Sequence, residues 1–231
     1  MKRIAVMQPY FLPYLGYWQL LAAVDRFVVL DDVNFRPRAW INRNRMLNSG
    51  RPHWFTIPLI AASQNRLICE LELVQDQLWR ERMLRSFRQS YSKAPELRPT
   101  MAVLERVMAC DKPSLSEFLL HSLQELLGHL LIETELVTTS RCYGNAGLRG
   151  EERLLDICRR EGASHYLNAP GGRELYSASN FCNLGVSLEF LEPKLPAYSQ
   201  GGSEPIPGLS IIDTLMFNNL AAVRRWVHLA A

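Results

Sequence analysis

The first thirty residues of the chain are arranged as a strand, a loop, a helix and a second strand. An apolar run at 4–7 is followed by a loop, and a helix-forming run at 18–24 is followed by a second apolar run at 27–30. Short apolar runs bounded by turn residues are typical of buried strands, and the spacing is that of a parallel βαβ unit. This feature predicts an α/β fold with a Rossmann-like, mostly parallel sheet.

The loop after the first predicted strand carries polar-tipped aromatic residues where a structural turn would carry small polar ones. Pro9 and Pro13 restrict its backbone, and Gly16 permits close approach at the helix start. In an open parallel sheet, ligands bind beyond the carboxyl ends of the strands, where this loop and the acidic pair Asp31 and Asp32 are expected. The candidate site residues from these segments are Gln8, Tyr10, Tyr14, Gly16, Tyr17, Asp31 and Asp32. The alternative is that the aromatic rings are core residues and the acids cap a turn.

Length and composition limit the class of protein. The 231 residues suffice for a single α/β domain, and a hydrophobic content of 48% with 21% charged residues is that of an ordinary globular protein. The net charge of +3 does not by itself indicate nucleic acid. No apolar stretch is long enough for a membrane span, and the amino terminus lacks the apolar region of a signal peptide. We therefore expect a cytoplasmic protein.

Cysteine and histidine spacing gives no sign of a metal site or a disulfide framework. The five cysteines are scattered and never in a C-x-x-C spacing, and the five histidines show no H-E-x-x-H pattern. This pattern predicts reduced thiols and no dedicated metal site.

A polar, basic segment follows the acidic pair at 34–45. It contains four arginines, three asparagines and one tryptophan. Arginine forks suit carboxylate or phosphate, and asparagine amides suit sugar hydroxyls. We expect a small anionic or glycosylated ligand here, with Trp40, Asn42, Arg43 and Asn44 as binding residues. The alternatives are a solvated loop without a specific role and, less favoured because no extended basic stripe follows, a nucleic-acid surface.

The rest of the chain predicts further strands and helices in an order that returns to α/β alternation. Strands are expected at 54–60, 67–73, 136–139, 165–168 and 186–191. Helices are expected at 77–91, 101–109, 114–127, 151–161 and 209–226, and an irregular segment at 193–207. Ser114 and Glu117 predict a capping box, and Gly128 a helix end. The helices between residues 76 and 128 predict a helical subdomain inserted into a single domain of residues 1–231.

Two further segments contribute candidate binding residues. The predicted strand 165–168 leads directly into a loop with two adjacent glycines, whose backbone N–H groups can form an anion-binding nest. Near the carboxyl terminus, two polar side chains lie three residues apart at a helix start; the alternative is that they only cap this helix. The candidates from these segments are Asn168, Gly171, Gly172, Tyr176, Ser210 and Asp213.

Several motifs together resemble the WbqC-like protein family. They are Q-P-Y-F-L-P-Y-L-G-Y-W-Q-L from Gln8, V-D-x-F-V-x-x-D-D-V-N-F from Val24, W-I-N-R-N-R from Trp40, S-Q-N at 63–65, G-G-R-E-L-Y at 171–176 and L-S-I-I-D-x-L-M-F-N at 209–218. The resemblance covers essentially the whole chain. It implies a bacterial protein associated with O-antigen, lipopolysaccharide and other surface-glycan biosynthesis. Many members carry His at the position of Met7, so a mechanism that depends on that histidine is not transferred to this chain.

Residues and resemblance together favour a transferase as the function. We expect an amide to form by acyl or aminoacyl transfer to an amino group of a nucleotide-linked sugar or a similar small substrate. Asp31 or Asp32 would act as general base or orient the amine, Tyr17 is the third catalytic candidate, and Arg43 would hold phosphate or carboxylate. Tyr14-Leu15-Gly16-Tyr17 also resembles the H-x-G-H motif of nucleotidyltransferases, but tyrosine lacks the positive charge of that motif. The alternative is a non-catalytic module that binds nucleotides or nucleotide sugars in a biosynthetic complex. The identity of any cofactor and the oligomeric state are left open by the sequence.

Overall fold

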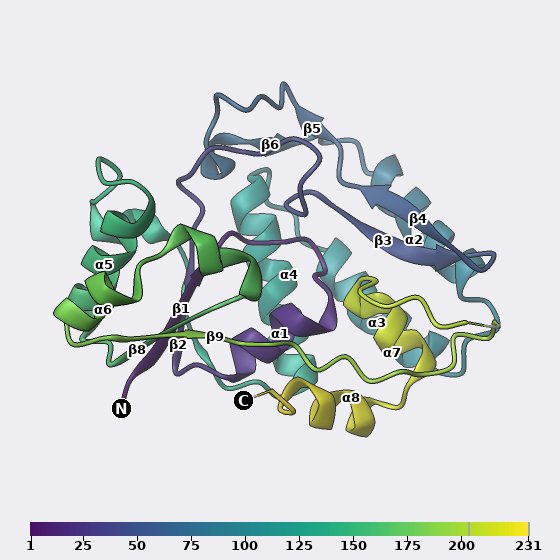
Figure 1. Ribbon diagram of the computed structural model, residues 1–231. Helices are drawn as coiled ribbons and strands as arrows, with labels where there is room; N and C mark the ends of the chain where they lie inside the picture. The colour runs from purple at the N-terminus through teal and green to yellow at the C-terminus, as the bar shows by residue number, and fades with distance from the viewer. Residues whose placement is uncertain (203, 231) are drawn as a thin grey trace.

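A five-stranded sheet forms the centre of the protein (Figure 1). The computed structural model describes residues 1–202 and 204–230. Every pairing within this sheet is parallel, which confirms the predicted α/β, Rossmann-like arrangement. In spatial order the strands are β7 (Glu135–Val137), β2 (Arg26–Val29), β1 (Arg3–Met7), β8 (His165–Asn168) and β9 (Ser187–Phe190).

The strand order places a switch point next to the first strand. The chain moves outward from β1 to β2 and β7, and then crosses back to add β8 and β9 on the other side of β1. In doubly wound sheets of this kind, ligands bind near the strand order reversal, beyond the carboxyl ends of the strands. The loops that leave β1 and β8 flank this position.

Alternating side chains of the strands enter two separate hydrophobic clusters. Ala5 and Phe27 face one cluster, whereas Ile4, Val28 and Tyr166 face the other. This is the alternation that a sheet covered on both faces requires. The helices of the first face are α1 (Leu15–Ala22), α3 (Leu97–Met108), α4 (Leu115–Leu130), α7 (Ile211–Phe217) and α8 (Leu220–Val227). Those of the second face are α5 (Gly150–Glu161) and α6 (Ala178–Asn183) (Figure 1).

Helices also occupy the segment where an insertion is expected. It consists of α2 (Leu78–Ser90), α3 and α4, and buried side chains of these helices share a single hydrophobic cluster with α1. Ser114 caps α4, accepting a hydrogen bond from the Glu117 amide. Two boundaries differ from expectation. Helix α3 begins at Leu97 because a proline in the first turn loses no helical hydrogen bond, and α4 passes Gly128 and ends with Leu131 in the left-handed conformation.

A hairpin and several short elements lie outside the main sheet. The hairpin joins β3 (Arg43–Asn48) and β4 (Arg51–Thr56), and a smaller pair joins β5 (Leu59–Ile60) and β6 (Glu72–Leu73). The 3-10 segments are η1 (Ile68–Glu70), η2 (Ser140–Tyr143) and η3 (Pro170–Leu175).

Three sequence-based expectations need correction here. Residues 43–48 form a strand that was not predicted from the sequence, because they pair with the whole of β4. The strand expected at 67–73 is mostly the 3-10 segment η1, and only residues 72–73 are extended. The single helix expected at 209–226 is divided into α7 and α8, with Asn219 capping the second. Residues 193–202 and 204–207 of the expected irregular segment contain neither helix nor strand, and residue 203 lies outside the described residues.

In the part of the chain that the structure describes, no helix is both long and apolar enough to cross a membrane.

Candidate functional site

The loop that leaves β1 is held in one conformation by side chains from distant motifs. Asn44 on β3 donates hydrogen bonds to the carbonyl oxygens of Phe11 (3.0 Å) and Leu12 (2.9 Å). Ser210, directly before α7, donates a further bond of 2.7 Å to the Leu12 carbonyl. Leu12 has a φ of 45°, which a non-glycine residue adopts only when its surroundings impose it. Three of the recognised sequence motifs therefore meet at this loop.

The end of the loop is tightly packed where α1 begins. Trp18 donates from its indole nitrogen to the Pro13 carbonyl at 3.0 Å. A side-chain carbon added to Gly16 would lie 2.5 Å from the Tyr14 ring and 2.7 Å from Pro193. Only glycine fits this position, because the chain after β9 passes directly over the helix start.

Two adjoining cavities lie around Tyr14. The first has a volume of about 260 Å³ and the second about 210 Å³, and both are lined by Tyr14 and Gly208. The second cavity is lined by Tyr10, Pro13, Tyr14, Trp40, Asn44 and Gly208. It thus joins the loop after β1 with the basic segment and brings together four of the candidate residues, Tyr10, Tyr14, Trp40 and Asn44.

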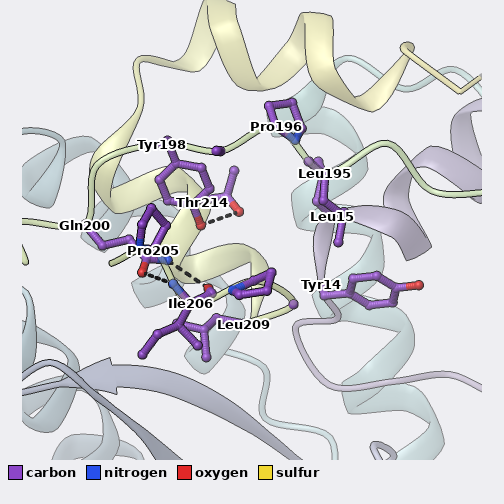
Figure 2. Close-up of a pocket in the computed structure, with 13 residues that line it drawn as sticks. Tyr14, Leu15, Leu195, Pro196, Tyr198, Gln200, Pro205, Ile206, Leu209 and Thr214 are labelled. Carbon is purple, nitrogen blue, oxygen red and sulfur yellow. Dashed lines mark hydrogen bonds between the residues drawn. The ribbon is translucent and has the colours of Figure 1, made fainter. Parts of the chain in front are cut away.

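Most residues that line the first cavity belong to one segment, residues 195–202 and 204–209, which we call the strap (Figure 2). Its lining from the strap includes Pro196, Tyr198, Gln200 and Ile206, opposite Tyr14 and Leu15. Figure 2 shows the Tyr14 ring directed away from Tyr198, on the far side of this cavity. Apolar residues, including three prolines, and two tyrosine rings line most of the cavity, with a few polar atoms among them, which is the usual composition of a small-molecule site.

Larger hollows lie at the opposite edge of the sheet. One, of about 580 Å³, is lined by Asp25 and Glu133, which precede β2 and β7. Another, of about 610 Å³, is lined by Ser164 and Ser187 at the start of β8 and β9. Both lie at the amino ends of strands and contain none of the predicted site residues. We therefore regard the Tyr14 cavities as the candidate site.

A buried carboxyl group fixes the strap to the body of the protein. Asp213 is fully buried and accepts hydrogen bonds from Tyr198 (2.8 Å), Gln200 (2.7 Å) and Tyr91 (3.0 Å). Burial raises the pKa of Asp213 above its ordinary value of 3.8, against the effect of these three donors. Among the described residues no Lys or Arg forms an ion pair with it.

This environment makes a prediction about the pH dependence of stability. Because the folded-state pKa of Asp213 is raised, the folded protein binds its proton more strongly than the unfolded chain does. The stabilising contribution is complete below about pH 3.8 and is lost as the pH rises through the raised value. We expect the free energy of unfolding of wild type, minus that of Asp213→Asn, to decrease with rising pH. Urea unfolding between pH 4 and 7.5 measures it, and a difference that is constant or grows with pH would contradict the assignment.

Asp31 lies at the end of β2 in a dense hydrogen-bond network. Its carboxylate is fully buried and accepts from the hydroxyls of Ser116 and Thr139, each at 2.7 Å, and from the Ser140 amide at 3.2 Å. Arg141 lies 3.8 Å away, although its own side chain is mostly exposed. Three hydrogen bonds therefore already use oxygen lone pairs that a general base would need.

Asp32 is paired with a buried arginine. Arg153 of α5 donates from one nitrogen to both carboxylate oxygens of Asp32 at 2.6 Å, and Ser140 donates to the same carboxylate. Both partners of the ion pair are buried. The pair joins the end of β2 to the helix on the second face of the sheet.

Tyr17, Gln8 and Asn42 make internal contacts. The Tyr17 hydroxyl donates to the Gln8 carbonyl at 2.9 Å, and burial raises the pKa of Tyr17 well above 10.0. Asn42 donates to the Ile57 carbonyl at 2.9 Å, across the start of the hairpin. Neither Tyr17 nor Asn42 lines the cavities around Tyr14.

The predicted residues after β8 form a separate group. Asn168 is buried, donates to the Tyr166 hydroxyl at 3.3 Å and accepts from the Ala169 amide. A side-chain carbon added to Gly172 would lie 2.9 Å from Asn168 and 3.0 Å from Tyr176, whereas one added to Gly171 would meet open space. These residues lie beside the switch point, but they do not line the cavities around Tyr14.

The sequence-based candidates do not include most of the residues that line the cavities, and three of those missed could contact a ligand. Tyr198, Gln200 and Gly208 belong to the strap, which looked irregular. The available signal was the presence of polar-tipped residues in a proline-bounded segment. No group of three or more His, Cys, Asp or Glu side chains suited to a metal ion occurs among the described residues.

The fold and these motifs define the class of protein: an α/β, Rossmann-like protein with a motif-lined cavity beside the loop that leaves its first strand. The model of the WbqC-like protein family matches residues 8–225, and the chain belongs to this family. It is also similar to the uncharacterized protein Rv1507c of Mycobacterium tuberculosis, with 28% identity over 222 residues that cover 94% of each chain. No solved structure is significantly similar to the chain.

Proposed function

We propose that the protein is a small-molecule transferase of bacterial surface-glycan assembly and that its substrate occupies the cavities around Tyr14. Support comes from one observation above all: the loop after β1, the basic segment and the segment around Ser210 meet at these cavities. Residues of these three segments belong to the motifs by which the chain resembles its family.

The proposed reaction is the formation of an amide. An amino group on a nucleotide-linked sugar would attack the carbonyl carbon of an activated acyl or aminoacyl donor, such as a thioester. The new C–N bond would replace the C–S bond, the amine proton would pass to a base, and the thiol would leave. Stacking on Tyr10 and Trp40 suits a sugar or a nucleoside in the second cavity, and Asn44 holds the wall of that cavity through its bonds to the loop.

The catalytic roles of Asp31, Asp32 and Tyr17 are part of the proposal, as positioning rather than proton-transferring groups. Asp31 and Asp32 are already hydrogen-bonded on their carboxylate oxygens, and Tyr17 on its hydroxyl. Asp31 and Asp32 would hold the carboxyl end of β2 in place, and Tyr17 would hold the loop after β1. Activity that is the same in an Asp31→Asn/Asp32→Asn variant as in wild type would remove these two residues from the mechanism.

A non-catalytic binding module is the second candidate, and the cavity lining favours it in one respect. Among the described residues that line the two cavities there is no Asp, Glu, His, Cys, Lys or Arg. The ionisable groups there are the phenols of Tyr10, Tyr14 and Tyr198, and burial raises the pKa of each. Under the transferase proposal the base is therefore a group of the second substrate or a side chain at the rim.

Replacing Tyr14 by alanine tests the location of the site. Because Tyr14 forms a wall of both cavities, we expect Tyr14→Ala to weaken ligand binding by about tenfold or more while the protein remains folded. The purified protein would be screened by thermal shift against nucleotide-linked amino sugars and then incubated with acyl thioesters, with mass spectrometry of the products. Leu175→Ala is the matched control, because Leu175 is 66% exposed and lies on η3.

The outcomes separate the two candidates. Acylated sugar that depends on Tyr14 supports the transferase, and stabilisation without any product supports the binding module. Ligand binding that is unchanged in Tyr14→Ala would show that the site lies elsewhere.

A further inference from the structure

Two tryptophans and two arginines form a surface cluster next to the second cavity, which we call the tryptophan platform: Trp40, Trp54, Arg43 and Arg45. The rings of Trp40 and Trp54 are stacked, with centres 5.3 Å apart and planes 29° apart. They are 38% and 43% exposed, although large aromatic rings are normally buried. An exposed stacked pair of this kind is a ready surface for another flat ring.

The hairpin brings the two arginines onto the platform. Arg43 and Arg45 alternate along β3 and therefore point to the same face of the hairpin, and Arg45 pairs directly with Trp54 on β4. The Arg43 guanidinium lies 4.0 Å from the centre of the Trp54 ring. The Arg45 guanidinium lies 5.4 Å from the centre of Trp40 and 5.9 Å from that of Trp54.

The charge of the platform is not neutralised within the protein. Among the described residues, no carboxylate forms an ion pair with Arg43 or Arg45. The Nε atoms of both side chains are buried and have no hydrogen-bond acceptor. A buried donor without an acceptor is unfavourable, and an arginine fork matches the oxygens of a phosphate. Arg43 also donates to the Arg38 carbonyl, so the two guanidinium groups have no anionic partner within the described residues and are available to an anion.

The position of Trp40 connects the platform to the cavity. Its ring is stacked on Trp54, and it also lines the second cavity with Tyr10 and Tyr14. A third guanidinium acts at the same place: burial raises the pKa of Tyr10, and the positive charge of Arg36 opposes that rise. A ligand ring resting on Trp40 would thus lie between aromatic walls and beside positive charge.

We propose that the tryptophan platform binds the nucleoside diphosphate part of a nucleotide-linked substrate. The base stacks on Trp40, and the diphosphate accepts hydrogen bonds from Arg45 and Arg43. The remainder of the substrate extends into the cavities around Tyr14. This inference rests on the proposed function and names its substrate class. A cavity of about 210 Å³ beside the platform suits a small ligand better than a continuous strand of nucleic acid, which needs an extended basic groove.

Calorimetric titration with defined probes tests the assignment. The probes are the diphosphates of uridine, thymidine, guanosine and adenosine, together with uridine, inorganic pyrophosphate and a single-stranded DNA 12-mer. We expect at least one diphosphate to bind, and to bind about tenfold or more tightly than uridine and pyrophosphate, because stacking and charge act together. Arg45→Gln and Trp40→Ala should each weaken that binding about tenfold or more, and Arg45→Lys by less.

Arg51→Gln is the matched control, since Arg51 lies on the same hairpin and is exposed. It should leave affinity within about twofold. Circular dichroism would confirm that each variant is folded, and Trp54→Phe provides a milder change of the same stack.

Three results would overturn the proposal: no diphosphate binds, binding is the same in Arg45→Gln as in wild type, or the DNA binds more tightly than every diphosphate with a steep salt dependence. Failure of the proposed function gives a different pattern. Diphosphate binding that depends on Arg45 without any transferase product would retain the platform and reject the transferase. Amide formation on sugars that lack a nucleotide would support the transferase and reject the proposed role of the platform.

Discussion

Asn44→Ala is expected to lower the free energy of unfolding by about 3–4 kcal/mol and to abolish ligand binding in the second cavity. The Asn44 side chain is buried, donates to the carbonyls of Phe11 and Leu12, and accepts from the Arg45 amide at 2.8 Å. Its removal leaves the Phe11 carbonyl and the Arg45 amide without this partner, whereas the Leu12 carbonyl keeps the bond from Ser210. Each buried polar group left unpaired costs about 1–3 kcal/mol. It also releases Leu12 from its unfavourable φ, so that the loop can relax away from the cavity.

Asn42→Ala is the matched control for this prediction. Asn42 lies immediately before the same strand and donates one hydrogen bond to a partly buried carbonyl. We expect it to cost about 1 kcal/mol and to leave ligand affinity within a few-fold. Urea unfolding measures stability and calorimetry measures binding. If Asn44→Ala were no more damaging than Asn42→Ala, the loop would be held by other contacts.

Arg153→Ala is expected to destabilise the protein by about 3–5 kcal/mol. The change leaves the buried carboxylate of Asp32 without its cation, and an uncompensated buried charge is far less favourable than an exposed one. Arg159→Ala on the same helix is the control. Its side chain is 67% exposed, so loss of its ion pair with Asp156 should cost about 0–1 kcal/mol.

A double variant identifies the cause of that loss. If the charge left on Asp32 is responsible, Asp32→Asn/Arg153→Ala should be more stable than Arg153→Ala alone. Equal or lower stability of the double variant in urea unfolding would show instead that lost packing of the arginine dominates. Neither Asp32 nor Arg153 lines the cavities around Tyr14. The folded fraction of Arg153→Ala should therefore bind the ligand with the affinity of wild type.

The parallel sheet could be predicted from sequence because its strands are short apolar runs with turn residues on either side. Pro9, Pro13 and Gly16 marked the loop after β1 for the same reason, since their backbone preferences are local. The hairpin strand β3 could not be recognised, because Arg43 and Arg45 stay at the surface and only Met46 and Leu47 are both apolar and buried. Pairing with β4, not composition, decides this segment.

The surroundings of the two acids depend on residues far along the chain. Ser116 lies 85 positions from Asp31, and Arg153 lies 121 positions from Asp32. No periodicity or spacing links such pairs, so the sequence could place these acids at the end of a strand but not find their partners. The strap is a similar case. It could be read as an irregular segment, but its place over Tyr14 follows from the contact of Asp213 with Tyr198 and Gln200.

A crystal structure of the protein soaked with a nucleotide-linked amino sugar tests the central claim most directly. We expect electron density for this ligand in the cavities between Tyr14, Trp40 and Gly208, with its nucleotide base stacked on Trp40. Density at the switch point beside Asn168 and Gly172, with those cavities empty, would contradict it.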